Sequence, residues 1–90
     1  MAKTVVVFRR WRNGDIMALF PFEPGQRENP ASCMSYERVG QHGYADYAYC
    51  IKCSRAAKPL EYATLKRELE GLGYDLEVRN RKNGQRVIYA

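Results

Sequence analysis

Apolar and polar residues alternate near the start of the chain, in two runs that flank the Asn-Gly pair at 13–14. A period of two is typical of β-strands, and an Asn-Gly pair between two such runs predicts a hairpin with a two-residue turn. This turn would pair Trp11 with Ile16, and it would gather apolar side chains on one face of the hairpin, with Arg9 as the exception. The expected apolar face consists of Val5, Val7, Trp11, Ile16, Ala18, Phe20 and Phe22.

Two more runs predict a second hairpin. "CMSYERV" alternates up to Gly40, and "ADYAYCIKC" alternates again, so we expect two strands joined by the loop "GQHGY". The segment before them, residues 21–32, holds three of the four prolines, which predicts a surface loop.

The stretch "KPLEYATLKRELEGLGYDL" predicts a helix. Pro59 suits the first helical position, and Glu61 suits the positive N-terminal end. Gly71 or Gly73 ends the helix, and Gly73 is favoured as the residue that follows it. Apolar side chains with helical spacing form a stripe at Tyr62, Leu65, Leu69 and Leu72.

The remaining segment, "YDLEVRNRKNGQRVIYA", predicts a third hairpin around the Asn-Gly pair at 83–84, with Leu76 and Val78 sharing a face. The element order is therefore β-β-β-β-α-β-β. It predicts a single α+β domain over residues 1–90, in which one helix packs on a mostly antiparallel sheet of about five to six strands.

The chain is basic, with 15 Lys and Arg against 10 Asp and Glu and a net charge of +5. This balance predicts an acidic partner, which would be nucleic acid or an acidic protein surface. Three cysteines cannot form a complete disulfide framework, and the apolar run in "MAKTVVVF" is too short for a signal peptide or a membrane span. We therefore expect a cytoplasmic protein without a membrane partner.

Cys33, His42, Cys50 and Cys53 include the residue types of a structural zinc site. If the strand continues through "AYCIKC", however, Cys50 and Cys53 point to opposite faces and cannot hold one ion. Cys33, His42 and Asp46 likewise include the types of a thiol-hydrolase triad, but no spacing brings them together. We expect no cofactor, no metal and no enzymatic activity, and a small zinc-stabilised module stays as an alternative.

Basic residues cluster in three places: around Trp11, after residue 78, and in the run Lys52, Arg55 and Lys58. Arginine with exposed aromatic rings suits phosphate neutralisation and base stacking. The loop around His42 lies between glycines, which allows close approach of a partner. The candidate binding residues are Arg10, Trp11, Arg12, Gln41, His42, Tyr44, Arg79, Arg81, Lys82 and Arg86.

The segments "ALFP" and "CMSY…GQHG-ADY", with "EYATLKRELEGLGYDL", resemble a group of small uncharacterised bacterial and phage-type proteins over roughly residues 4–78. The group has no established activity, so the resemblance implies only a prokaryotic, mobile-element setting and an intracellular location.

The leading hypothesis is a small basic, non-enzymatic protein that contacts nucleic acid through arginine-rich hairpin tips. The alternative is a phage-type accessory or inhibitor protein that docks on a host protein. An edge strand of either terminal hairpin could also pair two copies of the chain as a homodimer.

Overall fold

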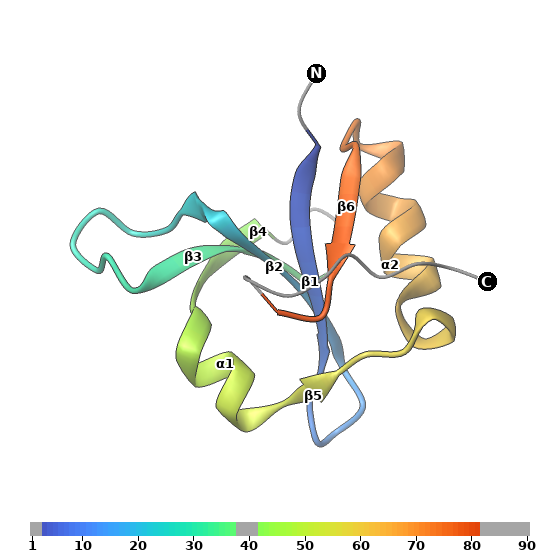
Figure 1. Ribbon diagram of the computed structural model, residues 1–90, viewed down its shortest axis with the longest axis horizontal. Coiled ribbons are helices and arrows are strands. Elements are labelled where there is room, and N and C mark those ends of the chain that lie inside the picture. The colour runs from blue at the N-terminus through green and yellow to red at the C-terminus, as the bar shows by residue number, and fades with distance from the viewer. Residues whose placement is uncertain (1–2, 38–41, 82–90) are drawn as a thin grey trace.

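The computed structural model describes residues 3–37 and 42–81 of the 90-residue chain. This part of the chain forms six strands and two helices around a central first strand (Figure 1). The elements, in chain order, are β1 (Thr4–Arg10), β2 (Ile16–Pro24), β3 (Ser32–Tyr36), β4 (His42–Asp46), α1 (Tyr47–Cys53), β5 (Arg55–Ala56), α2 (Pro59–Gly71) and β6 (Leu76–Arg79).

The strands form one sheet in the order β4-β3-β2-β1-β5, and β6 also pairs with β1. β1 pairs with β6 through Thr4–Val7 and with β5 through Arg9–Arg10, while β2 runs along its other side. Every strand pair is antiparallel except β1 with β6. The predicted α+β class with a mostly antiparallel sheet is therefore confirmed. β1 and β2 both have neighbours on two sides, and the pairing of two copies through a terminal hairpin stays a prediction.

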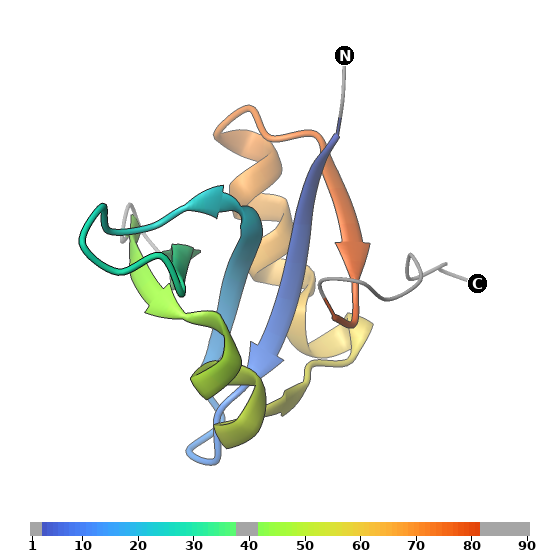
Figure 2. The same cartoon turned by 60° about the vertical axis from the view of Figure 1, so that its left-hand side comes forward.

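Two helices cover opposite faces of the sheet, where the sequence predicted one helix (Figure 2). On one face, α2 buries its apolar stripe against β1 and β2, and Phe8 stacks on Tyr62 with ring centroids 4.3 Å apart. On the other face, α1 buries Cys50 in a smaller cluster with Val7 and Leu19. Because a helix covers each face of the sheet, side chains of β1 are buried on both faces.

The α2 helix begins and ends where the sequence predicts. Pro59 occupies its first turn, and a carboxylate oxygen of Glu61 accepts a hydrogen bond from the backbone N–H of Lys58 at 2.8 Å. Gly73 takes a left-handed φ of 107°, which closes the C-terminus with the hydrogen bond from Tyr74 N to Leu69 O. Of the predicted stripe, Tyr62, Leu65 and Leu69 are buried, and Leu72 is exposed.

The register of the first hairpin differs from the prediction by one residue. Trp11 pairs with Asp15, and the loop between them has three residues and ends at Gly14 with a φ of 95°. The extra loop residue makes Arg10 face Ile16. A shift of one residue exchanges the faces of one strand against the other, so Val6 and Phe8, rather than Val5 and Val7, share a cluster with Ala18 and Phe20.

The predicted second hairpin is half right. β3 and β4 pair, with Tyr36 opposite His42, so residues 42–44 lie in a strand and not in the predicted loop. β4 then ends at Asp46, and the following residues form α1. The Asp46 side chain accepts a hydrogen bond from Tyr49 N at 3.0 Å and caps this helix.

The strand prediction for "YAYCIKC" failed because two periodicities overlap there. Tyr47, Tyr49 and Ile51 alternate as in a strand, but Tyr47, Cys50 and Ile51 also have the i, i+3, i+4 spacing of one helix face. The structure follows the second pattern, and those three residues belong to the cluster under α1. The expectation that Cys50 and Cys53 lie on opposite faces of a strand is therefore wrong.

Two other segments depart partly from the prediction. β2 continues through Pro24, so the proline-rich loop begins four residues later than expected. Leu76 and Val78 share a buried face in β6, as predicted, although β6 runs parallel to β1. The second arm of the predicted third hairpin lies outside the described residues.

Arg9 is buried in the sheet, with 6% of its surface exposed. Its guanidinium donates hydrogen bonds to Ile51 O at 3.0 Å, to Ser54 Oγ at 2.9 Å and to Ser54 O at 2.5 Å. The Ser54 hydroxyl in turn donates to Cys50 O. Carbonyl groups in the last turn of a helix lack partners within the helix, so Arg9 supplies donors that α1 needs. Burial lowers the pKa of Arg9 from its ordinary value.

We predict that Arg9→Met destabilises the fold by about 2 kcal/mol or more, because it leaves partly buried acceptors unpaired while keeping the apolar stem. Urea unfolding measures the free energy. The matched variant Arg67→Met, on the exposed side of α2, should change it by less than about 0.5 kcal/mol. Equal effects of the two substitutions would contradict this role of Arg9.

Candidate functional site

A basic groove of about 270 Å³ lies between the tip of the first hairpin and the end of α1. Its lining combines four cationic side chains with one indole ring, and no acidic side chain of residues 3–37 or 42–81 lines it. The lining residues are Arg10, Trp11, Arg12, Lys52, Cys53, Ser54 and Arg55.

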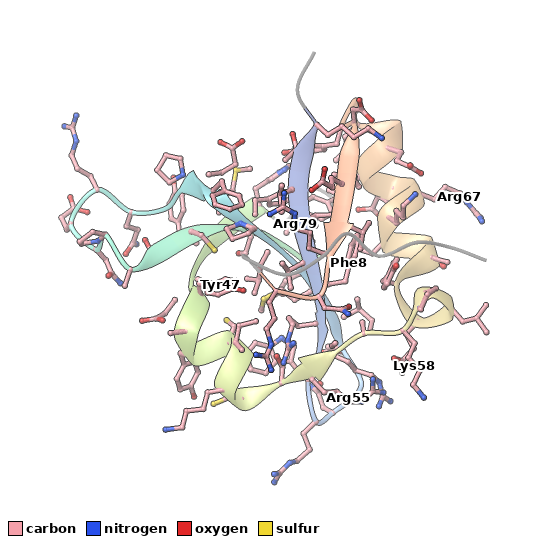
Figure 3. All side chains as sticks on the ribbon, viewed as in Figure 1. Phe8, Tyr47, Arg55, Lys58, Arg67 and Arg79 are labelled. Carbon is pink, nitrogen blue, oxygen red and sulfur yellow. The ribbon has the colours of Figure 1, made fainter. Side chains whose placement is uncertain are left out.

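Three segments that are distant in sequence build this basic groove. Arg10 ends β1 and Arg12 is exposed in the hairpin loop, while Lys52 is exposed in the last turn of α1. Arg55 follows in β5, which pairs with β1 through Arg10. Figure 3 shows Arg55 at the end of the sheet where the hairpin tip lies, whereas Arg67 projects away from the sheet on α2. The buried Arg9 holds the chain between Ile51 and Ser54 in this position.

Glu61 holds two of the groove arginines. Its carboxylate accepts two hydrogen bonds from Arg55, at 2.9 and 2.6 Å, and lies 3.3 Å from Arg10 Nε. The hydrogen bonds from Arg55 and from the backbone of Lys58 lower the pKa of Glu61 from 4.5 to about 2. Such bidentate pairs fix the plane of a guanidinium, and an arginine held in this way still has donors for a second anion.

A second hollow, of about 530 Å³, opens beside the hairpin tip against α2, and we call it the acidic cleft. Its apolar surface comes from Trp11, Ile16 and Leu65, and its remaining lining is polar. That polar lining consists of Asn13, Asp15, Glu37, Glu61, Thr64 and Glu68. Its volume lies within the range of small-molecule sites.

Trp11 lines both the basic groove and the acidic cleft. The ion pair between Arg10 and Glu61 also joins the two, because Arg10 lines the groove and Glu61 lines the cleft. One face of the hairpin tip is thus positive, the adjoining face is negative, and a half-buried indole lies where they meet.

The other predicted binding residues do not line the basic groove. His42 is exposed at the start of β4, where its Nε2 lies 3.0 Å from the hydroxyl of Tyr74. Tyr44 is also exposed on β4. Arg79 donates to Glu77 at 2.6 Å and lies over the ring of Phe22.

The structure thus places the predicted binding residues in different parts of the molecule. Arg10, Trp11 and Arg12 meet in the groove, whereas Arg81 follows β6, is exposed and does not line the groove. Gln41, Lys82 and Arg86 lie outside the described residues. The prediction omitted Lys52 and Arg55, although the sequence marks both as part of a basic run.

The cysteines do not form a metal site with His42. Within residues 3–37 and 42–81, no group of three or more His, Cys, Asp or Glu side chains is placed to hold a metal ion. The side chains of Cys33 and Cys50 are buried, and that of Cys53 is exposed. Burial raises the pKa of Cys50, which disfavours the thiolate that zinc needs. The described part of the chain does not support the zinc-stabilised module.

No helix of the described residues is long and apolar enough to cross a membrane. Comparisons with protein-family models, with curated protein sequences and with solved structures found no significant match.

We predict that the ion pairs of Glu61 make stability depend on pH in the acid range. A carboxylate whose pKa is lowered on folding stabilises the fold above its unfolded pKa of about 4.5, and this contribution is lost as the pH falls towards about 2. The urea midpoint of the wild type should therefore fall between pH 5 and pH 2.5 by more than that of Glu61→Gln. Parallel declines in the two proteins would show that these ion pairs do not stabilise the fold.

Proposed function

We propose that the protein is a non-enzymatic nucleic-acid-binding protein whose contact surface is the basic groove. The observation that carries this proposal is the convergence of Arg10, Arg12, Lys52 and Arg55 on one hollow that Trp11 also lines. Clustered cations neutralise successive phosphates and release counterions, which supplies most of the affinity in such contacts.

The composition of the basic groove favours phosphate over a carboxylate-bearing protein partner. Three of its four cations are arginines, whose planar guanidinium matches two phosphate oxygens at once. The adjoining indole adds a surface on which a base can stack, a contact that contributes on the order of 1–3 kcal/mol.

The shape of the site favours a single strand over a duplex. The basic groove is a short hollow between a hairpin and the end of a seven-residue helix. Among the described elements, α2 is the longer helix, but its exposed side mixes Glu70 with Lys66 and Arg67 and is not uniformly basic. Single strands are bound by a basic channel together with an aromatic ring, which is what the groove provides.

We predict that the protein binds the deoxyoligonucleotide dT7 with an affinity that falls as salt rises. The fluorescence of Trp11, the sole tryptophan, reports binding directly. Arg12→Ala and Lys52→Ala should each weaken binding roughly fivefold or more, because each removes a charge-assisted contact. Each should also reduce the slope of log K against log salt by about 0.7.

Arg67→Ala is the matched control, since it removes the same charge from the side of α2 that faces away from the sheet (Figure 3). It should leave the affinity within about twofold, since a distant exposed charge is largely screened. An absence of binding at 20 mM salt, or an equal loss in Arg67→Ala and Arg12→Ala, would overturn the proposal.

A further inference from the structure

The acidic cleft lies directly beside the basic groove, with Trp11 as a wall of both. The two hollows have opposite charge, so they cannot hold the same chemical group. A phosphate is attracted into the groove by its four cations, and it is repelled from a cleft lined by Asp15, Glu37, Glu61 and Glu68. A ligand that spans both must therefore be anionic at one end and rich in N–H donors at the other.

A nucleotide has this arrangement, since its phosphate is anionic and its base is uncharged. We infer that the protein binds a single-stranded nucleotide with the phosphate in the basic groove and the base in the acidic cleft against Trp11, with a preference for guanine. This inference rests on the proposed function and names the base that the same site selects.

The lining of the acidic cleft suits a flat ring with polar edges. Trp11, Ile16 and Leu65 supply apolar surface for the faces of a base, and a purine covers more of such surface than a pyrimidine does. The carboxylates around them are acceptors without hydrogen atoms to donate at neutral pH. The cleft therefore favours a base whose edge carries only hydrogen-bond donors.

Guanine presents such an edge, because its ring N1–H and its 2-amino group lie side by side and donate in parallel to one carboxylate. Thymine presents a single N–H between two carbonyl oxygens, which a carboxylate repels. Cytosine and adenine each offer one amino group beside an acceptor nitrogen. A carboxylate should therefore bind them more weakly than guanine and more strongly than thymine.

Asp15 and Glu37 are the carboxylates best placed to read the base, because both are exposed in the cleft lining. Glu61 is already bound to Arg55, and Glu68 accepts a hydrogen bond from the hydroxyl of Tyr36. Asp15 is held at the hairpin by Asn13, whose amide donates to its Oδ2 at 3.1 Å.

The test uses four seven-nucleotide oligomers, d(TTTXTTT), in which X is G, A, C or T, titrated against the full chain while Trp11 fluorescence is followed. The oligomer with X = G should bind at least fivefold more tightly than that with X = T, since a bidentate base contact discriminates by about 1–3 kcal/mol. The salt dependence should be the same for all four, because the phosphates are the same.

The double variant Asp15→Asn, Glu37→Gln removes both carboxylates at nearly constant shape, and Glu28→Gln, in the exposed loop after β2, is the matched control. In the double variant the preference for G over T should fall below twofold while the affinity for dT7 is kept or increased. The control should retain the preference, and urea unfolding of each variant verifies that it is folded.

Equal, salt-dependent binding of all four oligomers would overturn the guanine site and leave the proposed nucleic-acid function intact. A preference for G that survives in the double variant would also overturn it, because the carboxylates would not be the readers. Failure of every oligomer to bind at 20 mM salt would overturn both the inference and the proposed function.

Discussion

The buried guanidinium of Arg9 is the interaction on which the rest of the hairpin tip depends. Removing a cation from water is costly, so a buried arginine persists only where several acceptors meet it. Here the acceptors are Ile51 O, Ser54 Oγ and Ser54 O, all at the end of α1. The same bonds that satisfy the cation also fix α1 against the second face of the sheet.

That anchor explains how a short helix comes to line the basic groove. Seven residues are too few for a helix that is stable in isolation, so α1 depends on tertiary contacts for its position. Once α1 is held, Lys52 lies in its last turn and Arg55 follows in β5 beside β1. Two cations from the middle of the chain thus join Arg10 and Arg12 from the first hairpin in the basic groove.

The parts of the fold that the sequence predicted are those set by local chemistry. Proline, glycine and an apolar stripe delimit α2, and a single periodicity marks β1, β2 and β3. The prediction failed where one local pattern had two solutions: "YAYCIKC" fits both a strand and a helix face, and an Asn-Gly loop closes with two or three residues. For "YAYCIKC", only the packing of Cys50 and Ile51 against the sheet selects the helix.

Only part of the candidate site was predicted, again because local sequence does not determine long-range packing. Local sequence marked the cluster around Trp11 and the run containing Lys52 and Arg55 as basic, but their meeting depends on the long-range contacts of Arg9. The apolar surroundings of Arg9 in the alternating pattern were the one available indication of its burial. The acidic cleft had no sequence signature, because Glu37 and Glu68 are 31 residues apart and come together only by the packing of α2 on the sheet.

The most direct test of this account is a map of the contact surface by ¹H–¹⁵N spectra of the labelled chain during titration with dT7 at low salt. If the basic groove binds the phosphates, the largest changes in amide shifts will occur at 10–12 and 52–55, with little change along the exposed side of α2. Changes concentrated instead on β4 or at Arg79 and Arg81, with 52–55 unmoved, would contradict the central claim that the hairpin tip and the end of α1 form one nucleic-acid-binding surface.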